Sequence, residues 1–319
     1  MGPRCKMKIA IEAKNLVRGF GNFVAVDAIS FAVRQGEIFG FLGPNGAGKS
    51  TTIKMLCGIL APTSGELWVD GVDVKLFPEE AKQRIGYMSQ KFSLYEDLTA
   101  AENIDFYSGI YRLPKASKKE RIESILEMSG LVEERDRLAG ELAGGYKQRL
   151  ALGCAILHDP KIIFLDEPTA GVDPISRRRF WDLIARMAQE GKTIFVTTHY
   201  MDEAEHCDRL ALINAGRIVA SGTPSELKTA RTEQQLLEVA TSQPIKAFGV
   251  IKRAFPQASP ALFGVNVHLT VTDRPSAENK LREVLTRESI SVESVSPIPF
   301  SLEDVFCRVV EETPNGVGL

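Results

Sequence analysis

The stretch GPNGAGKS, residues 43–50, decides the fold. It has the spacing G-x-x-x-x-G-K-[ST], and it lies between the apolar run EIFGFLG (37–43) and KSTTIKMLCGIL (49–60), whose apolar residues have helical spacing. A glycine-rich loop between a buried strand and a helix points backbone N–H groups at phosphate oxygens. The sequence therefore predicts an α/β protein with a phosphate-binding loop at this point.

Each residue type in this loop suits a nucleotide. Lys49 can reach the β and γ phosphates, and the Ser50 hydroxyl can ligate Mg²⁺. The dipole of the helix that follows adds positive potential. The predicted nucleotide-binding residues of this stretch are Gly43, Pro44, Asn45, Gly46, Ala47, Gly48, Lys49, Ser50 and Thr51.

Two adjacent acids follow a second apolar strand, in KIIFLDEP at residues 161–168. Asp166 is predicted to hold Mg²⁺, directly or through water, and Glu167 to orient or deprotonate an attacking water. Alone, two acids after a strand would indicate only the beginning of a loop. Downstream of a phosphate loop, they indicate a functional pair.

Composition argues against some classes of protein. The 319 residues carry a net charge of −2, which disfavours a nucleic-acid binder that relies on a strong positive field. The five cysteines are scattered without metal-ligand spacing, so we expect buried or neutral thiols in a reducing cytosol. No stretch approaches the ~18 apolar residues of a membrane span. We therefore expect a soluble protein whose membrane role would come through a partner.

Apolar patterns predict an α/β core with a helical insert. Residues 7–42 form short alternating runs typical of strands, 99–158 have helical spacing, and 161–220 return to strand and helix alternation. The stretch GELWVDGVDV predicts a hairpin with its turn at Asp70-Gly71. Expected helix starts are the capping boxes TAAE (99–102), SKKE (117–120) and TPSE (223–226).

The character of the chain changes after about residue 231. Strand and helix patterns still alternate, but without glycine-rich loops, and SLEDVFCRVV adds a last helix. We expect two domains: a nucleotide-binding domain over 7–230 and a small α+β accessory or regulatory domain over 231–319.

Four further motifs complete a family pattern. They place Phe20 in RGFGNF, Gln90 in MSQKF, Asp173 in AGVDP and His199 in TTHYMDEAEHCDRL. With the two phosphate motifs, the chain resembles the ATP-binding subunit of ABC transporters from residue 7 to about 225. The resemblance implies a P-loop NTPase core of the ABC ATPase type with an antiparallel β subdomain.

The resemblance also implies a role for each of these side chains. Phe20 would stack on adenine, Gln90 would touch Mg²⁺ and sense the membrane partner, Asp173 would belong to the D-loop, and His199 would contact the γ-phosphate. Read singly, Gln90 is a surface polar residue and His199 a cap at a strand end. Phe23 is a rival of Phe20 for the stacking position.

The stretch LAGGYKQRL, residues 142–150, resembles the family signature L-S-G-G-Q-x-Q-R. In that family two nucleotide domains face each other, and the signature contacts the ATP held by the opposite domain. Ala143, Gly144 and Gly145 would do so here. Ala143 replaces the serine that meets the γ-phosphate, and Tyr146 replaces a glutamine. We therefore expect a working but weakened closed state.

The SLEDVF motif and the region around the phosphate loop resemble subunits of ABC-2-type exporters, including drug exporters. This implies ATP hydrolysis coupled to transport, with ATP and Mg²⁺ as cofactors. The implied partners are transmembrane permease subunits and a second nucleotide-binding domain, in a homodimer or on a paralogous domain, and no nucleic acid. The chain would lie on the cytoplasmic face of the membrane.

Two alternatives remain open. One is a soluble ABC ATPase outside transport. The other is a binding module with an inactive nucleotide site, which intact Lys49, Asp166, Glu167 and His199 disfavour. A docking surface is also expected: of the aromatic residues Phe92, Tyr95, Phe106, Tyr107 and Tyr111, about three should be core, and the others should line a groove for a cytoplasmic helix of the membrane partner.

Overall fold

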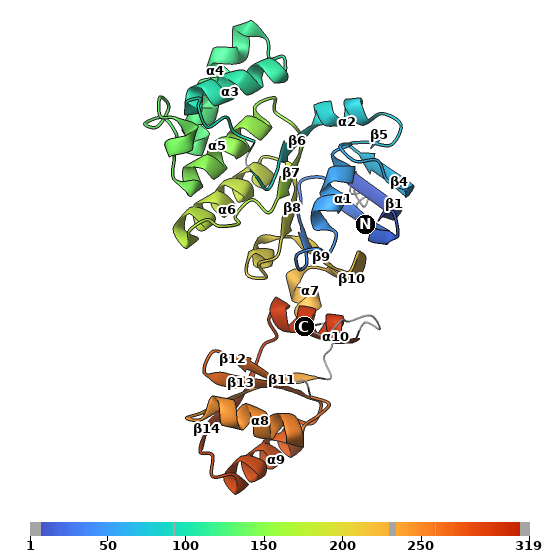
Figure 1. The fold of residues 1–319 in the computed structure, drawn as a ribbon, viewed down its shortest axis with the longest axis vertical. Helices are drawn as coiled ribbons and strands as arrows, with labels where there is room; N and C mark the ends of the chain where they lie inside the picture. The colour runs from blue at the N-terminus through green and yellow to red at the C-terminus, as the bar shows by residue number, and fades with distance from the viewer. Residues whose placement is uncertain (1–7, 92, 230–233, 259, 313–319) are drawn as a thin grey trace, which may run out of the picture. The chain divides into compact units, whose positions relative to one another are not determined.

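The computed structural model describes residues 8–91, 93–229, 234–258 and 260–312. The chain divides into two compact units (Figure 1). The first ends at Pro224, and the second spans Ser225–Glu312. Within the described ranges, no helix combines the length and the apolar character needed to cross a membrane.

A six-stranded sheet forms the centre of the first unit. Its strand order is β10-β9-β3-β8-β7-β6, parallel except for the antiparallel edge strand β10. Three inner strands are buried along their whole length, as expected for strands covered on both faces. The strands are β3 (Ile38–Leu42), β6 (Ile85–Met88), β7 (Ile162–Asp166), β8 (Thr193–Thr198), β9 (Arg209–Asn214) and β10 (Arg217–Gly222).

A second, antiparallel sheet has the order β2-β1-β4-β5. Its hairpin turns at Asp70-Gly71 with φ of 47° and 75°, the left-handed pair that a two-residue hairpin requires. This turn was predicted from the sequence. The strands are β1 (Ile9–Phe20), β2 (Phe23–Arg34), β4 (Ser64–Val69) and β5 (Val72–Asp73).

Two apolar cores lie in the first unit. One packs the antiparallel sheet and α1 against the central sheet, and the other lies beneath the helices α3 to α6. Figure 1 shows those helices on one side of the central sheet and α1 on the other. The helices are α1 (Lys49–Leu56), α2 (Pro78–Arg84), α3 (Ala100–Ile110), α4 (Lys115–Ser129), α5 (Gly144–Ile156) and α6 (Pro174–Gln189), with short 3₁₀ turns η1 (Ala139–Glu141) and η2 (Glu203–His206).

The predicted helix starts had different outcomes. Thr99 and Glu102 form the predicted capping box of α3, and α7 (Pro224–Thr229) begins within the predicted TPSE stretch. The prediction for SKKE was wrong, because α4 already begins at Lys115. Its N-cap is Pro114, whose fixed φ suits a helix start. The helix therefore begins two residues before Ser117.

The second unit is an α+β domain, as the sequence predicted. Its four antiparallel strands have the order β12-β13-β11-β14, and the chain order βαββαβ is that of ferredoxin-like domains. Strand β12 was missed because it is short and exposed. The elements are β11 (Gln235–Thr241), α8 (Pro244–Ala254), β12 (Ala261–Phe263), β13 (Asn266–Val271), α9 (Arg274–Arg287), β14 (Val292–Ile298) and α10 (Leu302–Glu312).

Three of the cysteines are buried, as the sequence predicted, and a fourth is exposed. Cys57, Cys154 and Cys207 are buried, and burial raises the pKa of each thiol, so all three are neutral. Cys307 is exposed. It lies on α10 five residues after buried Leu302, so the helical period turns it to another face. Cys5 lies outside the described residues.

Candidate functional site

The phosphate loop joins β3 to α1 at the carboxyl edge of the parallel strands. Gly48 has φ 106°, and a Cβ there would lie 2.5 Å from the Ala25 carbonyl oxygen. A Cβ on Gly43 would lie 2.1 Å from the Ile213 carbonyl oxygen. Only glycine fits at these two positions. Gly46 faces open space at φ 80°, which leaves the loop free to receive a ligand on that side.

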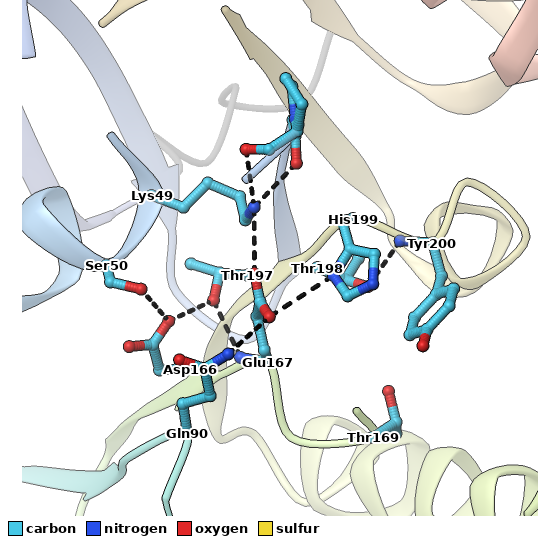
Figure 2. A network of polar contacts seen from close by, with 12 residues as sticks. Lys49, Ser50, Gln90, Asp166, Glu167, Thr169, Thr197, Thr198, His199 and Tyr200 are labelled. Atoms are coloured by element: carbon cyan, nitrogen blue, oxygen red, sulfur yellow. Dashed lines mark hydrogen bonds and ion pairs between the residues drawn. The ribbon is translucent and has the colours of Figure 1, made fainter. Parts of the chain in front are cut away.

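Lys49, the first residue of α1, is buried against this loop. Its Nζ donates to the carbonyl oxygens of Gly43 at 2.7 Å and Pro44 at 3.1 Å. It also forms an ion pair of 3.0 Å with Glu167, where the two side chains are 4% and 6% exposed (Figure 2). The sequence analysis assigned Lys49 to the phosphates and Glu167 to the attacking water. The structure therefore places these two residues in contact.

Glu167 lies just after β7 with a left-handed backbone, φ 49°. Its carboxylate oxygen Oε2 accepts from Gln90 Nε2 at 2.9 Å and lies 3.4 Å from His199 Nδ1. Its backbone N–H donates to Thr197 Oγ1 at 3.0 Å. Figure 2 shows these side chains converging on Glu167 from separate segments of the chain. The structure thus brings together four residues that the sequence analysis selected: Lys49, Gln90, Glu167 and His199.

Asp166 is buried beside this group. It accepts from Thr197 Oγ1 at 2.7 Å and Ser50 Oγ at 3.1 Å (Figure 2). Burial raises the pKa of its carboxyl, and the hydrogen bonds from the two hydroxyl groups oppose that rise. Two hard oxygen donors, one hydroxyl and one carboxylate, therefore lie together at the start of α1. Across the part of the chain that the structure describes, no group of three or more His, Cys, Asp or Glu side chains could hold a metal.

The two candidate aromatic rings lie at the hairpin between β1 and β2. Phe20 pairs with Phe23 in the register of these strands. Their exposed fractions are 46% and 62%. The Arg18 guanidinium lies 4.5 Å from the centre of the Phe20 ring. Both rings are therefore open to the surface and accessible to a ligand.

The residues of the predicted signature lie elsewhere. Ala143 is the N-cap of α5, and Gly144 is exposed, with no atom within 4 Å of a Cβ built on it. Gly145 packs so closely on α6 that a Cβ would lie 2.4 Å from Ser176 Oγ. Within the described ranges, no hydrogen bond or ion pair joins Ala143 or Gly144 to the group around Glu167. Asp173 caps α6 by accepting from the Ser176 N–H at 2.9 Å.

Sequence reasoning missed two residues of the site. Thr197 connects Asp166 to the backbone of Glu167, and its position two residues before His199 was the available signal. Gln148, which is fully buried, donates to the Pro168 carbonyl oxygen at 2.5 Å. It links the signature helix to the turn that follows Glu167.

Comparisons with known proteins agree with this geometry. The model of the ABC transporter family matches residues 26–170. The chain is 54% identical to the probable multidrug ABC transporter ATP-binding protein YbhF of Escherichia coli (strain K12) over 226 residues, 70% of this chain and 39% of that protein. It is 35% identical to the Nod factor export ATP-binding protein I of Rhizobium sp. (strain N33) over 303 residues, 95% of this chain and 97% of that protein.

A solved structure supports the fold independently. It is a dimeric ATP-binding cassette in a post-hydrolysis state, bound to ADP and Pi. Its TM-score is 0.61 and its identity 26%, and the match covers 67% of this chain and 98% of that one. The likeness to this cassette and the full-length match to the Nod factor export protein lead to the same conclusion. The chain belongs to the ATP-binding proteins of ABC transporters, and its first unit has the fold of an ABC ATPase.

Proposed function

We propose that this chain binds and hydrolyses ATP to power an ABC exporter, of the ABC-2 type. The observation that carries the proposal is the convergence of Lys49, Gln90 and His199 on the Glu167 carboxylate. Relatives named for multidrug transport and for Nod factor export support the exporter class. The chain spans 39% of the length of the first of them.

Nucleotide binding would use the phosphate loop. Its N–H groups and the dipole of α1 favour phosphate anions, and Lys49 would exchange its contact with Glu167 for the β and γ phosphates. The other loop residues, Gly43 to Thr51, would surround those phosphates. Phe20 would stack on the adenine ring, with Phe23 as the alternative.

Hydrolysis would depend on Glu167 and His199. Glu167 would accept a proton from the attacking water, as the water oxygen bonds to the γ-phosphorus and the bond to the β–γ bridging oxygen breaks. His199 would contact the γ-phosphate. Ser50, Gln90 and Asp166 would hold Mg²⁺, and hydroxyl, amide and carboxylate oxygens are ligands that suit this ion. Bound Mg²⁺ would neutralise phosphate charge.

A second nucleotide domain would complete the site. Ala143, Gly144 and the N-terminus of α5 are exposed or open, which suits a contact with the ATP of a partner domain. That domain could be a second copy or a paralogous domain. Asp173 would lie at the same interface, beside Gly145.

Transmembrane permease subunits would dock on the helical layer. Tyr95 and Phe106 are exposed, and their rings lie 4.5 Å apart in edge-to-face contact. Tyr107 and Tyr111 pack against the core instead. Phe92 lies outside the described residues. The exposed pair would receive a cytoplasmic helix of the permease and so hold the chain at the inner face of the membrane.

We propose that residues 231–319 form an accessory or regulatory domain outside the nucleotide chemistry, because every motif assigned to the nucleotide precedes it. A chain ending at Ala230 should therefore still bind and hydrolyse ATP. Failure of a well-folded truncated chain to bind ATP would contradict this division.

The main test is phosphate release by the purified full chain with ATP and Mg²⁺. We expect turnover that requires Mg²⁺ and that is lost in Glu167→Gln. The same variant should form an ATP-dependent dimer in sedimentation experiments. Binding of ATP without any phosphate release by the wild-type chain would contradict the proposal and favour an inactive binding module.

A further inference from the structure

A buried carboxylate, Glu203, lies four residues after His199 at the start of η2. It is 1% exposed. Thr169 Oγ1 donates to its Oε1, and Arg177 Nε lies 3.4 Å from the same oxygen. Its second oxygen, Oε2, is buried without a hydrogen-bond partner among the described residues. Burying a carboxylate costs stability even when it is paired, so packing alone does not account for this residue.

Thr169 connects Glu203 to the turn that carries Glu167. Thr169 is itself buried and follows Glu167 by two residues. The turn is held by backbone hydrogen bonds from Ala170 N to the Glu167 carbonyl oxygen and from Val172 N to the Thr169 carbonyl oxygen, both 3.2 Å. A contact to Thr169 therefore acts on the hydrogen-bonded turn that includes Glu167.

Arg177 connects Glu203 to the ring beside His199. The Arg177 guanidinium lies 4.4 Å from the centre of the Tyr200 ring, and the rings of Tyr200 and His199 lie 4.1 Å apart. Figure 2 shows Tyr200 beside His199, with Thr169 in the same view. Glu203 thus reaches His199 along the chain and through Arg177 and Tyr200.

We infer that Glu203 is a positioning residue of the hydrolysis site, an inference that rests on the proposed function. The segment from His199 to Asp202 leaves β8 at one end, where Tyr200 N donates to Thr198 Oγ1 at 3.0 Å. At its other end, Glu203 fastens it to the turn of Glu167. The two anchors together keep His199 Nδ1 3.4 Å from Glu167 Oε2.

Kinetics of Glu203→Ala test the inference. We expect kcat to fall by ~10- to ~100-fold, the usual effect of misplacing a catalytic group. The KM for ATP should stay within about twofold, because no hydrogen bond or ion pair joins Glu203 to the phosphate loop in the described part of the chain. Thr169→Val removes the same hydrogen bond at nearly constant volume, so it should show the same pattern even if Glu203→Ala folds poorly.

A double-mutant cycle with His199→Ala separates positioning from general damage. If Glu203 acts through His199, adding Glu203→Ala to His199→Ala should lower single-turnover hydrolysis no further. An equal loss in both backgrounds would overturn the inference. A His199→Ala variant with wild-type turnover would instead contradict the proposed role of His199, so the two failures are distinguishable.

Two variants serve as controls. Asp202→Asn removes the other carboxylate paired with Arg177, at 3.7 Å, but this one is 72% exposed, so kcat should be unchanged. Glu203→Gln keeps an oxygen that can accept from Thr169, so it should restore turnover to within about threefold of wild type. A glutamine variant as slow as the alanine variant would overturn the role of the Thr169 contact.

Discussion

The Lys49 ammonium lies 3.0 Å from the Glu167 carboxylate, and both groups are buried. Each is the countercharge of the other, and neutralising one leaves the other uncompensated. Phosphate would have to replace Glu167 as the partner of Lys49. Binding and hydrolysis therefore share one ion pair, and variants of its two members should fail in different ways.

Glu167→Gln should bind ATP and lose hydrolysis. Removing the carboxylate frees Lys49 for phosphate and removes the proton acceptor, which is worth about 10²- to 10⁴-fold in rate. Equilibrium binding of a fluorescent ATP analogue and phosphate release measure the two effects. Wild-type turnover in this variant would show that Glu167 is not the base.

Lys49→Ala should lose ATP binding itself, because Lys49 neutralises phosphate charge in the ground state. Lys54→Ala is the matched control, since Lys54 is an exposed lysine on the same helix. The same fluorescent analogue reports both. If Lys49→Ala and Lys54→Ala both bound the analogue with wild-type affinity, Lys49 would not be a nucleotide-binding residue.

The adjacent glycines of the signature should behave differently. Gly145→Ala should destabilise the chain by about 1–3 kcal/mol, because the new Cβ would overlap Ser176. Gly144→Ala has open space and should leave the free energy of unfolding unchanged. Denaturant unfolding measures both. Equal losses of unfolding free energy in the two variants would mean that the close contact between α5 and α6 does not cause the destabilisation.

The same stretch allows a test of the dimer. In the Glu167→Gln background with ATP, Ala143→Ser should strengthen dimerisation by up to about 1.5–3 kcal/mol, through a new bond to phosphate. Gly144→Asp should weaken it by like-charge repulsion, with Gly144→Ala as control. Sedimentation reports all three. Normal dimers of Gly144→Asp would show that this stretch does not contact the nucleotide of a partner.

His158 should make stability pH-dependent. Burial lowers the pKa of its imidazole, whose ring stacks on Tyr111 at 3.9 Å. The unfolded chain therefore binds this proton more readily than the fold does. The contribution of neutral His158 to the free energy of unfolding is therefore fully present above the ordinary pKa near 6.5. It is lost as the pH falls below that value, by at most about 1.4 kcal/mol per pH unit.

Unfolding of wild type and His158→Gln at pH 7.5 and pH 5.5 measures this effect. The glutamine variant should lose less stability between the two values, because it does not titrate there. Identical losses would assign the acid sensitivity to other groups.

Tyr95→Glu should weaken membrane docking and leave ATP hydrolysis by the purified chain intact, since the ring is exposed. Tyr111→Glu should unfold the helical layer, because Tyr111 packs against the core. Retention of the chain on sedimented membranes and phosphate release separate the two cases. If Tyr95→Glu lost hydrolysis as well, the damage would be structural.

Motif spacing predicted much of the site because it reports local backbone geometry. The loop before Lys49 and the acids at the end of β7 lie where the glycine and strand patterns placed them. The ion pair between Lys49 and Glu167 could not be predicted, because it depends on how distant segments pack. Thr197 was missed for a related reason: a threonine in a strand is explained by β propensity alone.

Local rules failed where two of them competed. Both a capping box at Ser117 and a proline at 114 could start α4, and the structure uses the proline. Phe20 and Phe23 are paired residues across one hairpin, so alternation alone cannot rank them.

The backbone of Glu167 has a consequence for laboratory evolution. A left-handed conformation costs a residue with a side chain about 1–2 kcal/mol, and glycine adopts it freely. Glycine at position 167 would remove that cost, but it would also remove the buried partner of Lys49, a loss of about 3–5 kcal/mol. Selection for heat resistance should therefore retain the carboxylate at this position. A screen of this protein for thermostable variants should thus keep Glu167 even without a demand for activity.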